Sequence, residues 1–249
     1  MSDPIHQFVI EPRIPLEIGG IDLSFTNSSL WMAIALVTST TLLTLATSKN
    51  QMIPGRAQVA AEMIYGFIAN MVRENLGPRG QEYFPLIFTL FMLVLTGNML
   101  GMLPYSFTYT SHLIVTGALA LVIFLTVMVI GIARHGTHFF DLFVPPGVPA
   151  WLLPLILPIE ILSFLVRPIT LAMRLFANMM AGHLILKVFA GFSVAMLTSF
   201  GVAGFFMALL PAGFNVILIS FEFLVAFLQA YVFSILACIY LKDTIEIAH

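Results

Sequence analysis

Charged residues are scarce in this sequence. Asp, Glu, Lys and Arg make up only 9% of its 249 residues, against about a quarter in an ordinary soluble domain. Hydrophobic residues reach 60%, and the mean hydropathy is +1.03. A chain this poor in charge cannot cover a soluble surface, so the composition predicts an integral membrane protein in contact with the lipid bilayer. Its net charge of -2 lacks the basic excess of nucleic-acid-binding proteins, and we expect no nucleic-acid partner.

Cysteine is nearly absent as well. With Cys238 as the single cysteine, an internal disulfide and a cysteine-rich zinc site are both excluded. His135 and His138 have a spacing that could suit a metal, but no further ligand accompanies them, so we expect neither a metal nor a cofactor. The sequence also has no glycine-rich phosphate loop followed by Lys and Ser or Thr. We therefore expect no nucleotide site and no catalytic activity on this chain.

Targeting signals and internal repeats are missing too. The first residues lack the basic start of a signal peptide and the Arg- and Ser-rich character of a transit peptide, so the mature chain is expected to begin near Met1. No strong internal repeat is visible, which disfavours a transporter built from inverted repeats.

Long apolar runs, by contrast, are abundant. A membrane-crossing helix needs about 20 apolar residues, and three segments have this length with almost no charge: 29–47, 84–104 and 112–133. Between the first two, segment 55–75 repeats an apolar residue every four positions, while polar residues occupy the other faces. This pattern predicts an amphipathic helix on the membrane surface, with a short helix packed on the spans as the alternative. The apolar positions are Val59, Met63, Phe67 and Met71.

The C-terminal part contains two longer apolar segments, 151–189 and 205–242, with a glycine-rich stretch at 201–213. The first would reach about 58 Å as a helix, roughly twice the hydrocarbon thickness of a bilayer. It must be steeply tilted or broken at one of its prolines. We favour the tilt, because prolines early in a helix are tolerated. The two segments together predict a long, steeply tilted hairpin.

The sequence thus predicts an all-α integral membrane protein with five membrane-crossing helices and one amphipathic surface helix, forming a single membrane domain over 1–249. Basic residues outside the spans gather on one side in this arrangement, which is the cytoplasmic side by the positive-inside rule. Segment 1–28 is then external, segment 134–150 is a cytoplasmic loop, and the C-terminus is cytoplasmic. The cytoplasmic basic residues are Lys49, Arg56, Arg73, Arg79, Arg134 and Lys242, against Arg13 on the other side.

Each segment of the predicted hairpin carries a stripe of polar residues. At 100° per residue, residues seven apart lie on one helix face. In the first segment Asn178 lies about 40° from Arg174, and His183 points to the opposite side. The first stripe consists of Glu160, Arg167 and Arg174, and the second of Asn215, Glu222 and Gln229, with Tyr240 about 20° from its line.

The two stripes match in depth. In an antiparallel hairpin of regular helices, residues at equal depth have numbers with a nearly constant sum. The level pairs are His183 with Glu222 in the outer leaflet, Arg174 with Gln229 in the middle, and Glu160 with Asp243, near Tyr240 and Lys242, at the cytoplasmic end. We therefore expect the polar groups in layers through the membrane.

Titratable groups at these depths indicate proton transfer. A histidine and a glutamate can each hold and release a proton, as a relay from the outer water requires. Arg174 is a permanent cation whose place in a membrane costs roughly 3 kcal/mol. It could receive a partner's carboxylate, keep it ionised and separate two half-channels. Structural roles stay open: Glu222 could neutralise Arg174, His183 could serve only as a hydrogen-bond partner, and Glu160 and Arg167 could be interfacial.

The run RLFANMMAGH at 174–183 resembles the signature of subunit a of F-type ATP synthases, the stator channel of the membrane sector. The resemblance extends to TGNMLGMLP at 96–104 and to 222–240, and it covers essentially the whole chain. It implies a transmembrane first helix, a membrane-surface second helix, two further spans and a tilted hairpin that curves along a ring of c subunits. The implied partners are this c-subunit ring, the peripheral-stalk b subunits, the remainder of the ATP synthase and the bilayer.

The resemblance also implies roles for individual residues. Arg174 matches the essential arginine of the family, with Asn178 and Gln229 beside it. His183 and Glu222 match proton-access positions, and some bacterial relatives carry the histidine and the acidic residue exchanged between the two helices. Glu160 matches a position near the cytoplasmic exit and Tyr240 one near the end of the last helix, both with weaker functional claims.

The resulting hypothesis is a proton-translocating stator subunit. Protons pass from outside through His183, Glu222 and Asn215 to a ring carboxylate, and leave near Glu160 under the influence of Arg174. Two other classes stay open, a self-contained proton-coupled transporter and a structural membrane scaffold. H⁺ is the default ion and Na⁺ a variant. The expected location is the bacterial plasma (inner) membrane, with the mitochondrial inner membrane as the alternative.

Overall fold

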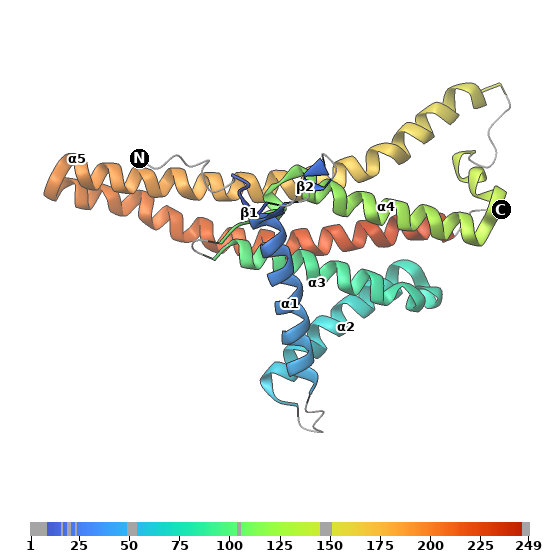
Figure 1. Cartoon of the computed structure of the whole chain (residues 1–249), viewed down its shortest axis with the longest axis horizontal. Helices are drawn as coiled ribbons and strands as arrows, with labels where there is room; N and C mark the ends of the chain where they lie inside the picture. The colour runs from blue at the N-terminus through green and yellow to red at the C-terminus, as the bar shows by residue number, and fades with distance from the viewer. Residues whose placement is uncertain are drawn as a thin grey trace. The chain divides into compact units, whose positions relative to one another are not determined.

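The computed structural model describes residues 9–15, 17–18, 21–22, 24–48, 54–103, 106–144 and 151–245. Long helices dominate this part of the chain (Figure 1). Within these described ranges, five helices are long and apolar enough to cross a membrane: Asn27–Thr47, Gly80–Gly101, Leu113–His135, Leu153–Ser199 and Ala203–Ile245. The prediction of an all-α membrane protein is confirmed.

Short strands precede the first long helix. β1 (Pro12–Ile14) pairs antiparallel with β4 (Phe25–Thr26), and β2 (Glu17–Ile18) with β3 (Ile21–Asp22). Asn27 then begins α1 (Asn27–Thr47). Its Nδ2 donates to the carbonyl oxygen of Val9 at 3.0 Å, and its Oδ1 accepts from the backbone N–H of Ser28 at 2.9 Å. The side chain thereby ties the start of α1 to the segment before the strands.

α2 (Arg56–Leu76) presents two apolar faces. One face is packed inside the protein and includes Ile68 and Met71, whereas the other leaves Val59 and Met63 exposed. The predicted four-residue repeat therefore begins on the surface and reaches the packed face at its last member. An exposed apolar stripe suits contact with lipid, so the position of α2 on the membrane surface stays our prediction.

The elements from α2 to α4 follow one another closely. Gly77 ends α2 with a φ of 64°, a conformation that glycine adopts without strain. The following elements are η2 (Gly77–Tyr83), α3 (Phe84–Gly101), η3 (Tyr109–Ser111), α4 (Leu113–His135) and η4 (Gly136–Phe143).

The chain folds as two compact units, each built from three stretches of sequence. The first unit comprises the described residues up to 41, 93–112 and 175–230. The second comprises those in 42–92, in 113–174 and from 231 onward. Long helices pass from one unit to the other, so each unit gathers segments that are distant in sequence.

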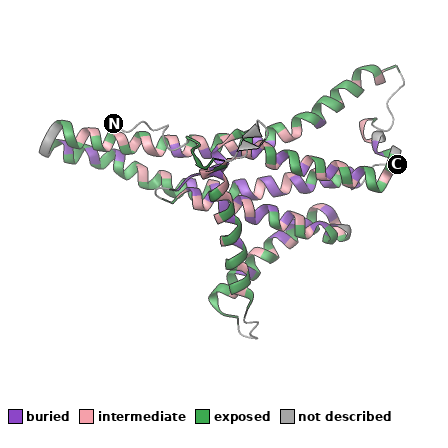
Figure 2. Cartoon of the chain, viewed as in Figure 1, coloured by how far each residue is buried: buried purple, intermediate pink, exposed green. Residues whose placement is uncertain are grey.

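In the first unit α5 (Leu153–Ile245) turns back on itself, and its two arms lie side by side (Figure 1). Phe189 and Phe214 stack across the arms with ring centroids 5.4 Å apart. The end of α3 joins them, because the fully buried Asn98 donates from Nδ2 to the carbonyl oxygen of Ala226 at 3.2 Å. Much of both arms is exposed near the turn (Figure 2). Large apolar residues such as Leu197 and Phe206 are among the exposed ones there, as contact with lipid or with other apolar helices requires.

Prolines do not interrupt the first arm of α5. Residues 153–199 are helical throughout, although they include Pro154, Pro158 and Pro168. Pro154 lies in the first turn, where the helix does not need a backbone N–H. This helix has 47 residues, more than twice the about 20 that cross a bilayer. A steep tilt in the membrane therefore stays our prediction.

An aromatic cluster lies in the core of the second unit. Phe139 of η4 and Phe164 of α5 are both buried, and Phe143 meets the ring of Phe164 edge-on at 5.4 Å. α4 approaches this core closely at Gly131. A Cβ built at Gly131 would lie 2.5 Å from the ring of Phe139 and would collide with Thr244 near the end of α5. Gly131 therefore permits the packing of three elements.

Replacing Gly131 by Ala is expected to destabilise the second unit, because the new methyl group overlaps with Phe139 and Thr244. Overpacking of this kind costs about 1–3 kcal/mol. Gly117→Ala in the same helix is the matched control, since nothing lies within 4 Å of its added Cβ. Thermal unfolding of the purified chain in detergent compares the two variants. Equal melting temperatures would contradict the packing described for Gly131.

Candidate functional site

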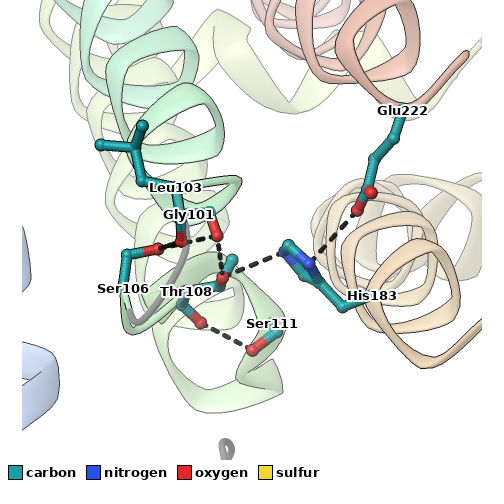
Figure 3. Close-up of polar contacts among 7 residues, drawn as sticks. All are labelled: Gly101, Leu103, Ser106, Thr108, Ser111, His183 and Glu222. Carbon is teal, nitrogen blue, oxygen red and sulfur yellow. Dashed lines mark hydrogen bonds and ion pairs between the residues drawn. The ribbon is translucent and has the colours of Figure 1, made fainter. Parts of the chain in front are cut away.

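His183 and Glu222 form the central polar pair of the first unit (Figure 3). They come from opposite arms of α5, and each residue is buried, at 7% and 5% exposure. Nδ1 of His183 lies 3.4 Å from Oε1 of Glu222. The structure therefore brings together two residues that the depth argument set level, and leaves them close enough to share a proton after a small closing movement.

Gly182 makes room for the carboxyl group of Glu222. A Cβ at position 182 would lie 2.7 Å from Oε1 and 3.1 Å from Cδ of Glu222. These separations are too short for any side chain at 182 unless the carboxyl group moves. Only glycine lets the carboxyl group lie this close to the first arm, beside the ring of His183.

Thr108 contacts the other ring nitrogen of His183. The loop between α3 and α4 brings its Oγ1 to 3.0 Å from Nε2. The same hydroxyl lies 3.0 Å from the carbonyl oxygen of Gly101, to which it donates. Ser106 lies next to it, with Oγ at 2.9 Å from the carbonyl oxygen of Gly101 and 2.7 Å from that of Leu103. A connected set of hydrogen bonds therefore runs from the loop to His183, whose Nδ1 faces Oε1 of Glu222 (Figure 3).

Aromatic residues hold this loop in place. Tyr109 is buried against Gly97, and its hydroxyl donates to the carbonyl oxygen of Leu93 at 3.1 Å. The ring of His112 stacks on Phe107 with centroids 5.1 Å apart. Burial lowers the pKa of His112, so this ring is neutral at neutral pH and adds no charge to the loop.

Lys187 supplies a positive charge near the pair. It follows His183 by one turn of α5, and the two side chains interact electrostatically. A neighbouring cation disfavours a second positive charge on the imidazole. The electrostatics of the site therefore favour a neutral His183.

Three further residues singled out by the sequence belong to the first unit. Gln229 is buried, Asn215 is half-buried and Asn178 is exposed. Within the described residues, the buried Oδ1 of Asn215 has no hydrogen-bond partner. A buried amide oxygen needs such a partner, and water is the usual one where protein supplies none.

The remaining predicted residues belong to the second unit. Arg174 is exposed on α5, whereas Glu160 and Tyr240 are half-buried. Arg174 is thus accessible at the surface of an apolar arm. Arg174 and Gln229 fall in different units, so their predicted pairing stays a prediction.

Arg167 and Asp243 form an ion pair that the sequence reasoning missed. Nη1 of Arg167 lies 2.7 Å from Oδ2 of Asp243, and the guanidinium lies 5.3 Å from the ring centroid of Tyr240. The depth argument set Asp243 level with Glu160, one heptad before Arg167. Helical side chains lean toward the N-terminus of their own helix. In an antiparallel pair the two leans converge, so the long side chain of Arg167 can reach an aspartate that the depth argument had set about two turns away.

The hydroxyl residues of the loop were also missed. Thr108 and Ser106 lie in the polar run 106–112 between two apolar helices. The available signal was that buried hydroxyl groups there need partners, but the partner of Thr108 is distant in sequence.

Regarding metals, no group of three His, Cys, Asp or Glu side chains gathers within the described part of the chain.

Comparison with known proteins identifies the family. Residues 29–242 match the family described as ATP synthase A chain. The chain belongs to this family. It is 57% identical over 245 residues to ATP synthase subunit a of Rhizobium etli, covering 98% of both chains. It is 54% identical over 248 residues to that of Agrobacterium fabrum, covering 100% of this chain and 99% of the relative. With subunit a of Parvibaculum lavamentivorans the identity is 53% over 247 residues, covering 99% and 95%.

In this member of the subunit a family, Gly182→Ala is expected to destabilise the chain by about 1–3 kcal/mol, because its methyl group displaces the carboxyl group of Glu222. Gly191→Ala on the same arm is the control, since nothing lies within 4 Å of its Cβ. Thermal unfolding in detergent measures both. In a Glu222→Ala background the cost of Gly182→Ala should disappear, and an unchanged cost would contradict the contact.

Proposed function

We propose that the chain is the proton-translocating stator subunit of a rotary F-type ATP synthase. It provides two offset half-channels to the carboxylates of a c-subunit ring, and Arg174 separates them. The observation that carries the proposal is the buried pair of His183 and Glu222 between the arms of a membrane hairpin. Membership of a family whose relatives are named ATP synthase subunit a supports it.

The outer half-channel runs through His183, Glu222 and Asn215. An isolated charge inside a membrane costs at least about 3 kcal/mol. A histidine and a glutamate that hold one proton in common avoid this cost, because both groups are then neutral. The separation of 3.4 Å and the space beside Gly182 support such sharing. The pair accepts a proton from the outer water and passes it to a ring carboxylate.

Arg174 acts on the ring carboxylate by its permanent charge. At about 4 Å and an effective dielectric constant of about 20, the attraction between the two charges is about 4 kcal/mol. This corresponds to a lowering of the carboxyl pKa by about three units. A carboxyl group that reaches Arg174 therefore loses its proton, and protons cannot pass directly between the half-channels. The exposure of Arg174, and of Asn178 one turn further on, supports contact with a ring.

The inner half-channel opens near Glu160 and Tyr240. Glu160 receives the released proton toward the cytoplasm, and the ion pair of Arg167 and Asp243 holds the two arms of α5 together there. The N-terminus lies outside and the C-terminus in the cytoplasm of a bacterium, whose plasma membrane contains the complex. The distribution of Lys and Arg outside the spans supports this orientation.

The partners follow from this role. The c-subunit ring carries the protons, the b subunits of the peripheral stalk hold the chain stationary, and other subunits of the complex bind nucleotide and synthesise ATP. Each proton that crosses 100 mV releases about 2.3 kcal/mol. Several protons in sequence supply the rotational work. The chain itself is a non-catalytic subunit.

Arg174→Ala is expected to abolish ATP-driven proton pumping in vesicles that contain the assembled complex, because no cation then forces the ring carboxylate to release its proton. Arg56→Ala is the control, since Arg56 is an exposed arginine at the start of α2, outside the proposed path. Acidification of the vesicle interior, normalised to the amount of assembled complex, measures pumping.

A proton gradient imposed on the same vesicles then tests for leakage. Loss of pumping at normal assembly supports Arg174 as the separator of the half-channels. Normal pumping by Arg174→Ala would contradict the rotary mechanism. Proton transport by the purified chain without any ring would point instead to a self-contained transporter.

A further inference from the structure

Thr108 contacts two groups that make opposite demands on its hydroxyl. Oγ1 lies 3.0 Å from the carbonyl oxygen of Gly101 and 3.0 Å from Nε2 of His183. A hydroxyl has one hydrogen to donate, whereas a carbonyl oxygen can only accept. When Thr108 donates to Gly101, it must accept a hydrogen from Nε2. The His183 ring then carries its hydrogen on Nε2.

This tautomer determines whether a proton must lie between Nδ1 of His183 and Oε1 of Glu222. Nδ1 of the neutral ring then presents a lone pair to Oε1 of Glu222 at 3.4 Å. An ionised carboxylate also presents lone pairs, so the two atoms repel each other unless one proton lies between them. Within the described residues, neither oxygen of Glu222 has a hydrogen-bond partner. In this arrangement the pair therefore holds one proton in common.

The surroundings decide where that proton is bound. The titratable side chains on the described elements around His183 are Glu222 and Lys187 of α5, and Tyr109 and His112 of the loop. Tyr109 and His112 are neutral, and Lys187 opposes a positive ring. An ion pair also gains little from burial in a low-dielectric site. The proton is therefore bound to Glu222, and His183 is neutral.

A second arrangement satisfies the same groups when Glu222 is ionised. The ring then carries its hydrogen on Nδ1 and donates it to Glu222, and Thr108 turns to donate to Nε2. Gly101 accepts instead from Ser106, whose Oγ lies at 2.9 Å. The Ser106 hydroxyl then no longer donates to the carbonyl oxygen of Leu103. That oxygen still accepts a hydrogen bond from the backbone N–H of Ser106 at 3.1 Å. Every carbonyl oxygen therefore has a donor in both arrangements.

We propose that Thr108 is a positioning residue that sets the tautomer of His183, and that the hydroxyls of Thr108 and Ser106 turn together as Glu222 gains or loses a proton. Going from the second arrangement to the first, one proton adds at Nε2 and the Nδ1 proton moves to Oε1 of Glu222. The site gains one proton in total, and no other bond changes. This inference rests on the proposed proton uptake through His183 and Glu222.

The first test uses Thr108→Val, which keeps the shape of the side chain and removes its hydroxyl. ATP-driven pumping by the assembled complex should fall at least about tenfold, the usual size of effect when a buried hydrogen-bond partner is removed. Thr108→Ser keeps a hydroxyl and should restore pumping. Thr126→Val is the matched control, because the Thr126 hydroxyl donates only within its own helix, to the carbonyl oxygen of Val122 at 2.7 Å.

The second test observes the tautomer itself. ¹⁵N spectra of labelled histidine in the assembled complex, with a His183→Gln variant to assign the signal, should show Nε2–H at low outer pH and Nδ1–H at high outer pH. Thr108→Val should abolish this preference. A merely structural role for Thr108 would leave the tautomer ratio of His183 unchanged.

The outcomes separate this inference from the proposed function. A wild-type complex that pumps protons while His183 keeps one tautomer at every pH would overturn the inference and leave the function standing. Normal pumping by Thr108→Val would do the same. A wild-type complex that does not pump protons would overturn the function itself. If Thr108→Val fails to assemble, the wild-type spectra still decide.

Discussion

The buried contact between His183 and Glu222 is the interaction on which the account of this protein depends. Two titratable groups inside a membrane hairpin are stable only when each is neutral or paired, because water is not available to solvate them. Three residues help to meet this requirement. Gly182 leaves space for the carboxyl group, Thr108 contacts Nε2 of the His183 ring, and the positive charge of Lys187 disfavours a charged imidazole. A pair arranged in this way can exchange protons while it contributes little net charge.

The same constraint explains how other polar groups are placed. Asn98, fully buried, donates to a backbone carbonyl of the second arm of α5, and Arg167 pairs with Asp243 in the second unit. Several hydroxyls on the spans donate to carbonyl oxygens of their own helices, as those of Thr40, Thr126 and Ser220 do. Arg174 differs from these buried groups in its exposure, and an exposed cation on an apolar arm is accessible to a partner outside the chain. The proposed ring carboxylate supplies such a partner.

Much of this could be predicted from the sequence, and the failures have physical causes. Charge composition and long apolar runs predicted the membrane class, and helical periodicity with depth matching set His183 level with Glu222. The partner of Thr108 could not be predicted, because it depends on how a loop meets a helix 75 residues away. The pair of Arg167 and Asp243 was missed because depth matching of Cα atoms ignores the lean of long side chains.

The most direct test of the central claim is infrared difference spectroscopy of the assembled complex, recorded while the outer pH is raised. The carbonyl stretch of a protonated carboxylic acid should disappear on this change, and the band should be missing in Glu222→Gln. This result would show that Glu222 exchanges a proton with the outer water. A Glu222 that is ionised over the whole pH range, with pumping intact, would contradict proton sharing with His183.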